Sequence, residues 1–361
     1  MPYYSLNLSQ ITLLTTHLQE QILESPAIVN ESALNDLGFN TITGVEFKDV
    51  QFISLRKGGT TRPYSNGSSI ASEVGKLIQR ELVAKLSWNR VVDNIQNYRE
   101  KEPFHIDSES FSGLPNSEMQ IKSISTEYAE DVFSGLFHGA YNAAGTNSLA
   151  LYDGVFTLFK KQIDAEYTVT GSDYADKTKY TVKEGVTPEF DPTKQIIPTD
   201  AFADVTEATK TDNWDAFVAF INALPTKLRK APDGVIVYMS DATKTRIVDS
   251  YARTYPAFTP VNVGELGFGF MNLPKVTIVS HPVIGNGDML LASTKGNFDF
   301  GIDSLNNLNK IEADKMQEDF NNIIFQIQSA QGCRVHYFDA AHMAWNGKLN
   351  TPDTTLAGDY Q

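Results

Sequence analysis

Hydrophobic residues recur at every third or fourth position over residues 118–144, which is the spacing of one face of an α-helix. Asn116 and Ser117 can cap the start of such a helix, and Gly145 can stop it. A long helix is therefore predicted over about 117–145. The apolar positions on its face are Ile121, Ile124, Tyr128, Val132, Leu136 and Ala140. A second helix is predicted over 146–164, with Phe156 and Phe159 facing inward.

Residues 210–300 alternate between helical and strand patterns. The predicted elements are a helix at 213–229, a buried strand at 234–240, a helix at 242–255 and two strands within 275–294. Ser240 or Asp241 can cap the second of these helices, and Gly285–Gly287 supply a turn between the last two strands. This order of elements predicts a compact α/β lobe.

Residues 45–100 alternate between apolar and polar at both ends and are rich in turn residues between them. Glycines, a proline and serines gather between Arg56 and Ser69, which indicates a mobile loop. A long two-stranded excursion with a flexible tip is expected here, interrupted by a helix-like pattern from Glu73 to Val83. Because an isolated hairpin is barely stable in water, we expect it to lie across a neighbouring subunit.

The two ends of the chain carry shorter signals. Residues 1–44 hold a helical stripe that is too short to fold alone, so it must dock on its own domain or on a neighbour. Residues 165–212 are polar and turn-rich, which is typical of a loop or a small β element. Alternating residues over 319–345 predict long strands, with a break at Gly332.

The composition narrows the function. The chain of 361 residues carries 44 acidic and 30 basic residues, a net charge of −14, and has no basic stripe of the kind that grips phosphates. Its single cysteine, Cys333, cannot form an internal disulfide. Neither a secretory signal nor an apolar run long enough to span a membrane is present, so a soluble protein made in a reducing cytoplasm is expected.

Candidate chemical motifs are weak. His336, Asp339 and His342 lie close together in sequence, but in a strand His336 and Asp339 point to opposite faces, so no metal site is expected. The same geometry argues against a nucleophilic pair of Cys333 and His336. The glycine-rich stretches match neither nucleotide-binding loop pattern, and no hydrolase elbow occurs. We therefore predict no catalytic, cofactor or metal residues.

The order of elements resembles the Hong Kong 97-type major capsid protein of tailed bacteriophages and its encapsulin relatives. The stretches that carry the resemblance are 234–251, 273–294, 296–303 and 335–345. In 234–251 a strand ends at a small polar residue that caps the next helix, and in 273–294 a strand is followed by a proline-containing turn. Both features are common in that family. The match is one of architecture over nearly the whole chain, and no single motif proves it.

The resemblance implies an α+β fold with a defined division of the chain. The parts would be an N-terminal arm (1–44), an extended β-hairpin loop (45–100), a peripheral lobe with a long spine helix (101–199), an axial α/β lobe (200–304), and return strands with a C-terminal tail (305–361).

The same resemblance implies a structural protein of the virion, which assembles in the host cytoplasm into pentamers and hexamers of an icosahedral shell around double-stranded DNA. Its partners would be copies of itself, a portal, optional decoration proteins and, if Met1 is the native start, a separate scaffolding protein. Packaged DNA would lie near the acidic wall without specific contacts.

Four residues are candidates for contacts between subunits: Lys57, Gly58, Gly59 and Trp88. The two glycines permit unusual backbone angles at the loop tip, although an ordinary surface turn also explains them. Trp88 would anchor the base of the loop. Some relatives join a loop lysine to an asparagine of a neighbour, for which Lys57 is the one attractive donor, although a solvated surface lysine is the better explanation of one lysine in a turn.

Two alternatives remain open at this point. The chain resembles encapsulin shells almost as well as phage capsids. The second alternative belongs to a different functional class: a soluble α/β enzyme with an active site between its lobes. Particle size separates them, because a shell protein forms megadalton assemblies and the enzyme would elute as a small oligomer.

Overall fold

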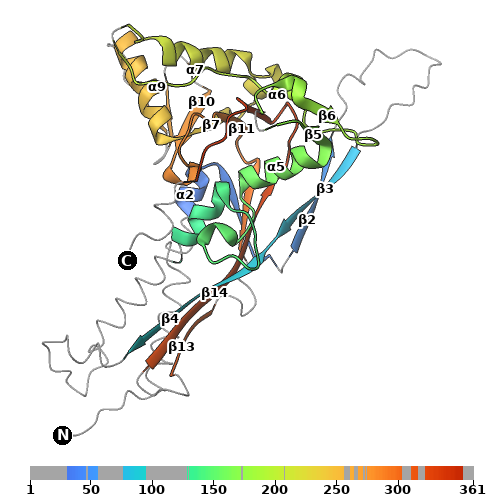
Figure 1. The fold of residues 1–361 in the computed structure, drawn as a ribbon, viewed down its shortest axis with the longest axis vertical. Helices are drawn as coiled ribbons and strands as arrows, with labels where there is room; N and C mark the ends of the chain where they lie inside the picture. Colours follow the sequence, from blue (N-terminus) through green and yellow to red (C-terminus); the bar gives the residue numbers. More distant parts are fainter. Residues whose placement is uncertain are drawn as a thin grey trace, which may run out of the picture.

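The computed structural model describes residues 31–45, 48–55, 76–94, 128, 130–171, 174–206, 208–255, 261–263, 267–270, 273, 275–302, 310–315 and 322–352. Figure 1 shows an elongated molecule, with a helical lobe carrying α7 and α9 at one end and the strands β4, β14 and β13 reaching toward the other. The β2–β3 hairpin lies along one side of this body.

A six-stranded sheet forms the centre of the helical lobe. Its order is β15 (Met343–Trp345), β11 (Leu291–Thr294), β7 (Val235–Met239), β10 (Val276–Ser280), β9 (Gly267–Gly269) and β8 (Val261–Val263). Strands β7 and β10 are parallel, and the other neighbours are antiparallel. All five residues of β7 are buried, as its unbroken apolar run predicts for a strand covered on both faces.

Three helices belong to this lobe: α7 (Asp212–Ala223), α8 (Thr226–Arg229) and α9 (Asp241–Thr254). Ser240 caps α9 by accepting a hydrogen bond at its Oγ from the amide of Thr243 at 3.2 Å. The predicted helix–strand–helix order is thus confirmed here. The single helix expected over 213–229 is wrong in one respect, because it is split between Ala223 and Thr226, where Pro225 cannot continue a helix.

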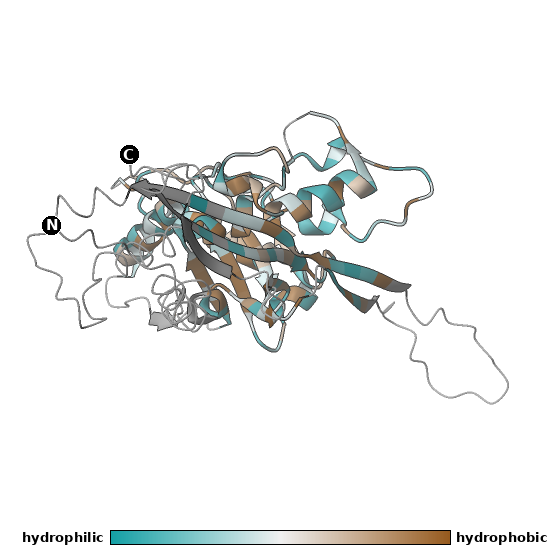
Figure 2. Cartoon of the chain, turned by 90° about the horizontal axis from the view of Figure 1, so that it is seen from below, coloured by the Kyte–Doolittle hydropathy of each residue, from teal (hydrophilic) through white to brown (hydrophobic). Residues whose placement is uncertain are grey.

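The six-stranded sheet separates two apolar cores. Val235, Val237 and Met239 of β7 face the core beneath α7 and α9. Ile236 and Tyr238, the alternate residues, face the larger core that the rest of the chain completes. Figure 2 shows that hydrophobic residues are concentrated on the central elements. The lobe and the body are consequently held together through one shared sheet.

A second, five-stranded sheet runs through the body and beyond it. Strand β1 (Phe39–Thr43) is parallel to β12 (Phe298–Ile302), and β12 pairs with the end of β14 (Asn322–Val335). The earlier part of β14 pairs with β4 (Lys85–Asn94) and with β13 (Lys310–Lys315) on its other side. The predicted break at Gly332 is wrong, because β14 continues through it and pairs Gly332 with Gly301.

The β2–β3 hairpin consists of β2 (Lys48–Leu55) and β3 (Lys76–Val83). The helix-like interruption predicted from Glu73 is therefore wrong over the part that the structure describes, because residues 76–83 are strand. After Ala84 the chain continues directly as β4, which leaves the hairpin and joins β14. The two strands of the hairpin are β2 and β3, so the segment around Trp88 pairs elsewhere.

The predicted long helix is seen at Tyr128 and over residues 130–138, and 117–127 lie outside the described residues. It ends at His138 and not near 145. A Cβ on Gly139 would lie 2.4 Å from the carbonyl oxygen of Tyr152, so the chain there is pressed against a second backbone. The following helix, α5 (Val155–Glu166), starts later than predicted, because residues 148–154 form a short turn and a connection.

The remaining elements are short. They are α2 (Glu31–Asp36), η2 (Ser148–Ala150), β5 (Tyr167–Val169), η3 (Lys177–Lys179), β6 (Tyr180–Val182), α6 (Pro192–Gln195) and η4 (Pro282–Ile284). The pair β5–β6 is the small β element expected within residues 165–212.

Candidate intersubunit surface

The β2–β3 hairpin has two chemically different faces. Its register places Lys48 opposite Val83, Val50 opposite Glu81 and Phe52 opposite Gln79. Because side chains alternate along a strand, these six residues share one face. Phe52 is 66% exposed and Val50 39%, so apolar side chains lie on the outside of the molecule. The Lys48–Glu81 ion pair at 2.8 Å lies beside them.

Exposed apolar side chains continue along the chain into β4. Leu86 is 50% exposed and Trp88 is 60% exposed, whereas Ser87 between them is buried. We call the exposed apolar residues of β2, β3 and β4 the outer strip. It consists of Val50, Phe52, Val83, Leu86 and Trp88. A monomeric protein seldom leaves this much aromatic and aliphatic surface on neighbouring elements without a use for it.

The opposite face of the hairpin rests on its own body. Leu82 is fully buried and packs with Val45, Ala84 and Ala330. Beneath it lie Gly301 and Gly332, which are paired in the β12–β14 register and which we call the glycine saddle. A Cβ at Gly301 would lie 2.5 Å from Leu82, and one at Gly332 would lie 2.4 Å from the carbonyl oxygen of Val83. Because the contact at Gly332 is with backbone, glycine at this position lets β3 cross the sheet closely, while at Gly301 the Leu82 side chain occupies the space that a Cβ would need.

A buried guanidinium ties β2 to the sheet. Arg334 of β14 donates to Asp299 Oδ2 from Nε at 3.0 Å and from Nη2 at 2.6 Å, and to Asp49 Oδ2 of β2 from Nη1 at 2.7 Å. His336 Nε2 also lies 2.8 Å from Asp299 Oδ2. Although burial opposes ionisation, hydrogen bonds from His336 and Arg334 hold the pKa of Asp299 below its ordinary value. The carboxylate is therefore charged and pairs with Arg334.

A second guanidinium ties β3 to the body. Arg80 Nη2 forms an ion pair with Glu189, and Arg80 Nε donates to the carbonyl oxygen of His336 at 2.9 Å. The Arg80 guanidinium also lies over the ring of Phe338, 4.9 Å from its centroid. Glu189 accepts a further hydrogen bond from the amide of Phe338 at 3.0 Å. The inward face of the hairpin is thus polar at its edges and apolar at Leu82.

Of the four residues predicted to contact a neighbouring subunit, the structure describes only Trp88. Lys57, Gly58 and Gly59 lie outside the described residues, so their role stays a prediction. Trp88 is on β4 and exposed, beyond the hairpin rather than at its base. The glycine saddle and the two arginine ties were not found from sequence, because each joins residues more than 30 positions apart.

The cluster considered for metal binding does not form. Among the residues that the structure describes, no three His, Cys, Asp or Glu side chains come together in a way that could hold a metal ion. The strand assumed for 336–342 is wrong, because β14 ends at Val335. His342 Nδ1 instead lies 2.6 Å from Asp339 Oδ1. Burial raises the pKa of the Cys333 thiol well above its ordinary value, so this cysteine is an unreactive core residue.

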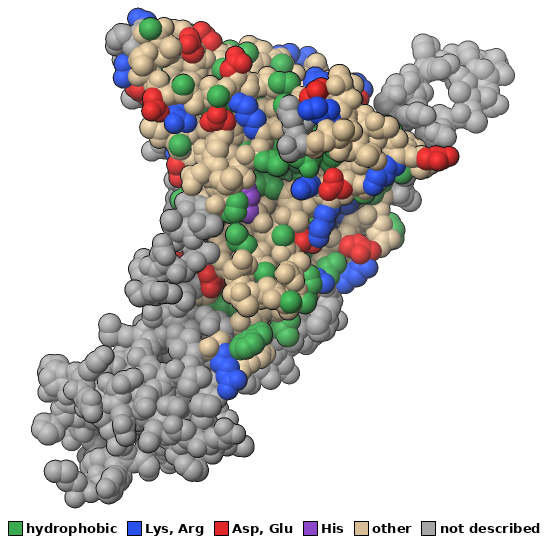
Figure 3. Space-filling view, viewed as in Figure 1, with side chains coloured by type: hydrophobic (Ala, Val, Ile, Leu, Met, Phe, Trp, Pro, Cys, Tyr) green, Lys and Arg blue, Asp and Glu red, His purple; other side chains and the backbone are tan. Residues whose placement is uncertain are grey.

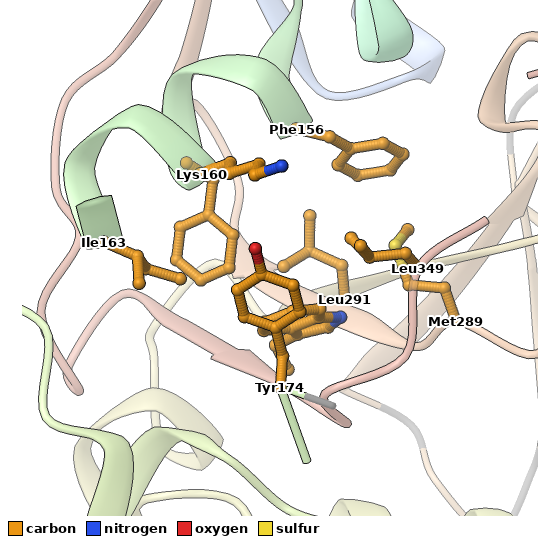
Figure 4. A pocket seen from close by; sticks show the side chains of 9 residues that line it. Phe156, Lys160, Ile163, Tyr174, Met289, Leu291 and Leu349 are labelled. Carbon is orange, nitrogen blue, oxygen red and sulfur yellow. The ribbon is translucent and has the colours of Figure 1, made fainter. Parts of the chain in front are cut away.

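Two hollows of the described part differ in size and in how open they are. One is lined by apolar side chains between α5 and the six-stranded sheet, among them Phe156, Ile163, Met289 and Leu291 (Figure 4). Its volume of about 10 Å³ is close to that of one water probe. A second, open hollow of about 230 Å³ lies at the root of the hairpin and is lined by Arg80, Lys161 and Arg334 among others.

The visible surface is mixed in charge. Figure 3 shows Lys and Arg side chains interspersed with Asp and Glu over the lobe of α7 and α9, without a continuous basic stripe on this face. No helix within the described ranges is long and apolar enough to cross a membrane.

Comparison with known proteins identifies the fold. No family model and no curated protein matches the sequence. Among solved structures, a chain of the capsid of the native GTA particle aligns over 89% of this chain and 89% of its own length, with 9% identity and a TM-score of 0.52. A chain of the empty GTA particle's capsid aligns over 87% and 88%, with 10% identity and a TM-score of 0.51. A chain of the satellite phage P4 procapsid covers 90% of this chain and aligns over 100% of its own length, with 10% identity and a TM-score of 0.49.

The two GTA capsid chains show that the likeness spans nearly all of both molecules. At this level of identity, what is shared is the arrangement of the elements. The α+β capsid-protein fold expected from the sequence is therefore confirmed: this chain has the fold of capsid subunits.

Proposed function

We propose that this chain is the major capsid protein of a tailed bacteriophage, which assembles into the pentamers and hexamers of an icosahedral shell around double-stranded DNA. The observation that carries the proposal is the shared fold, because it extends over 87–89% of this chain. Fold alone does not fix function, so the surface must supply the second argument.

The outer strip supports assembly. Burying a Phe or Leu side chain that was exposed contributes about 1.5–3 kcal/mol, and Trp88 and Phe52 are both more than half exposed in a single copy. Aromatic residues at the centre of an interface commonly dominate its binding energy. Copies of the chain that cover the strip in a closed ring would recover this energy, because cyclic assembly uses the same head-to-tail contact repeatedly.

The remaining parts of the proposal follow from the role of a shell. The chain would act as a structural protein of the virion without catalysis, assembled in the host cytoplasm with a separate scaffolding protein, a portal and possible decoration proteins. Lys57, Gly58 and Gly59 would belong to the loop that reaches a neighbouring subunit. With a net charge of −14, the protein would hold packaged DNA by enclosure and not by specific contacts.

Negative-stain electron microscopy of the purified full chain tests this function directly. Shells, rings or tubes of megadalton mass are expected, with sedimentation velocity as an independent measure of size. A homogeneous small oligomer at high concentration, in the presence and absence of a crowding agent, would contradict the proposal. It would favour the alternative of a soluble α/β protein.

A double variant tests the surface. Phe52→Ser with Trp88→Ser is expected to abolish particles while leaving the circular dichroism spectrum and thermal unfolding unchanged, because both side chains are exposed. Val182→Ser is the matched control, since Val182 is 47% exposed on β6 and is not part of the outer strip. Particles that form normally from the double variant would show that the outer strip is not an interface.

A further inference from the structure

The open hollow at the hairpin root has room for a large side chain. Residues of β3, of α5 and of the end of β14 line it together with Phe338. Its volume of about 230 Å³ is far more than one water molecule needs. Apolar surface within it comes from Leu158, Val335 and Phe338. A ring or a long aliphatic chain that entered the hollow would therefore meet apolar walls.

The rim of the same hollow carries charges of both signs. The guanidinium of Arg80 lies over the ring of Phe338, and the Lys161 side chain is 59% exposed on α5. Cations in such positions attract the face of an aromatic ring, and they attract tryptophan best. Glu81, whose side chain is 40% exposed, pairs with Lys48, which is 46% exposed. An ion pair this open to solvent contributes little, so Glu81 can accept a second cation.

Strand β4 presents the matching groups on its outer face. Leu86, Trp88 and Arg90 alternate with buried or inward positions, so they share one face. All three are exposed, and Trp88 is exposed to 60%. This face therefore offers one large ring with a cation beside it, which are the two groups that the hollow suits.

The two surfaces cannot meet within one chain. In the register of β4 with β14, Trp88 lies opposite Gln328, whereas the hollow is at Val335. At a rise of roughly 3.3 Å per residue, these positions on β14 are about 23 Å apart, which a side chain cannot span. Figure 1 shows β4 reaching away from α5. Two separate complementary patches on one chain are what a head-to-tail contact between copies requires.

We propose that Trp88 of one copy enters the hairpin-root hollow of a neighbouring copy, with its ring against Phe338 and Arg80, while Arg90 pairs with Glu81 of that neighbour. The contact rests on the proposed function, because it supplies the acceptor surface for part of the outer strip. An aromatic side chain seated in a pocket is the kind of residue that dominates the binding energy of an interface.

Cross-linking between two populations of the full chain tests the contact. One population carries Trp88→Cys and the other carries Lys161→Cys, and the two are mixed before a short bismaleimide is added. A product of twice the chain mass is expected, with one peptide from each population joined at the new cysteines. The buried Cys333 is present in every sample, so the parent chain serves as the blank.

Lys160→Cys is the matched control. Lys160 is the same residue type on the same helix and is exposed, but it lines the other hollow. Its cross-linking to Trp88→Cys should stay near the blank. Equal yields from Lys160→Cys and Lys161→Cys, or no product from either, would overturn the contact.

Electron microscopy of the same samples separates this contact from the proposed function. Shells formed by the parent chain without the Lys161→Cys product would overturn the contact and leave the shell standing. Small cross-linked rings without shells would support the contact and contradict the icosahedral shell.

Exchanging the charges gives a second readout that needs no cysteine. Arg90→Glu alone or Glu81→Arg alone is expected to raise the protein concentration at which particles form several-fold, because like charges would meet. The two changes together should restore the threshold of the parent. Both residues are exposed, so circular dichroism should show all three variants folded. A double variant that assembles no better than the single variants would show that these residues do not meet.

Discussion

At the scale of residues, a closed ring of hydrogen bonds joins three elements inside the protein. Tyr128 OH lies 2.5 Å from Ser87 Oγ and 2.6 Å from Ser329 Oγ. Ser329 Oγ donates to Gln331 Oε1 at 2.9 Å, and Gln331 Nε2 donates to Ser87 Oγ at 2.7 Å. Donation can therefore run in one direction around the ring: Ser87, Tyr128, Ser329, Gln331. Every member is satisfied, and the ring fixes the helix of Tyr128 to β4 and β14.

Removing one hydroxyl tests this ring. Tyr128→Phe should destabilise the protein by about 1–3 kcal/mol, because each of the two buried serine hydroxyls loses one of its hydrogen-bond partners. Tyr141→Phe is the control, since Tyr141 is 41% exposed and the phenyl ring keeps its contact with Lys85. Urea unfolding measures both. Equal stability of Tyr128→Phe and the parent protein would show that water replaces the ring without loss.

Two partly buried histidines make stability depend on pH. Burial lowers the pKa of His138 and of His281 below the ordinary value of 6.5, against the opposing effects of the Ile284 carbonyl on His138 and of the Asp241 charge on His281. The folded state then binds fewer protons than the unfolded state near that pH. The stabilisation is therefore fully present above about pH 6.5 and declines as the pH falls through it.

Thermal unfolding measured from about pH 7.5 down to about pH 5 would detect this effect, because the range covers both sides of the ordinary histidine pKa. The double variant His138→Gln with His281→Asn keeps a donor to the Ile284 carbonyl and an acceptor for the Val283 amide. It should flatten the pH dependence. An undiminished slope in the double variant would refute the assignment.

At the scale of elements, local sequence patterns predicted helices and strands correctly where tertiary packing favours the same structure. The apolar run of β7 and the Ser240 cap of α9 each lie within a few residues, and both elements formed as predicted. Strand β3 was missed because Leu77, Ile78 and Leu82 have helix-like spacing, which the pairing with β2 overrides. The early end at His138 was equally hidden, since it depends on Tyr152. The ties at the hairpin root depend on distant partners in the same way.

The two faces of the hairpin and β4 should respond differently to the same substitution. Leu82→Ala is expected to destabilise the fold by about 2–5 kcal/mol, because Leu82 is fully buried over the glycine saddle. Leu86→Ala removes the same atoms from a residue that is 50% exposed on β4, so its effect should stay within about 0.5 kcal/mol. Guanidinium unfolding compares the pair. A larger loss from Leu86→Ala would mean that the outer strip is packed within the single chain.

At the scale of the whole molecule, the part built around the two apolar cores differs from the projecting strands in how much buried core supports it. The two cores share the six-stranded sheet and contain nearly all of the largest buried aromatic residues. Strands β4, β13 and the first part of β14 extend beyond them (Figure 1). A sheet this narrow has little core of its own, so it gains most from contact with another copy. The exposed Leu86 and Trp88 on β4 fit that requirement.

The net charge of the chain opposes contact between copies. Each chain carries a net charge of −14, so copies repel one another before apolar surfaces meet. Raising the ionic strength from about 0.1 M to about 1 M shortens the screening length from about 10 Å to about 3 Å. The threshold protein concentration for particle formation, followed by light scattering, should therefore fall as salt is added. Sodium and potassium chloride should act alike, because screening depends on ionic strength. A threshold that rises with salt would instead mean that ion pairs between subunits outweigh their general repulsion.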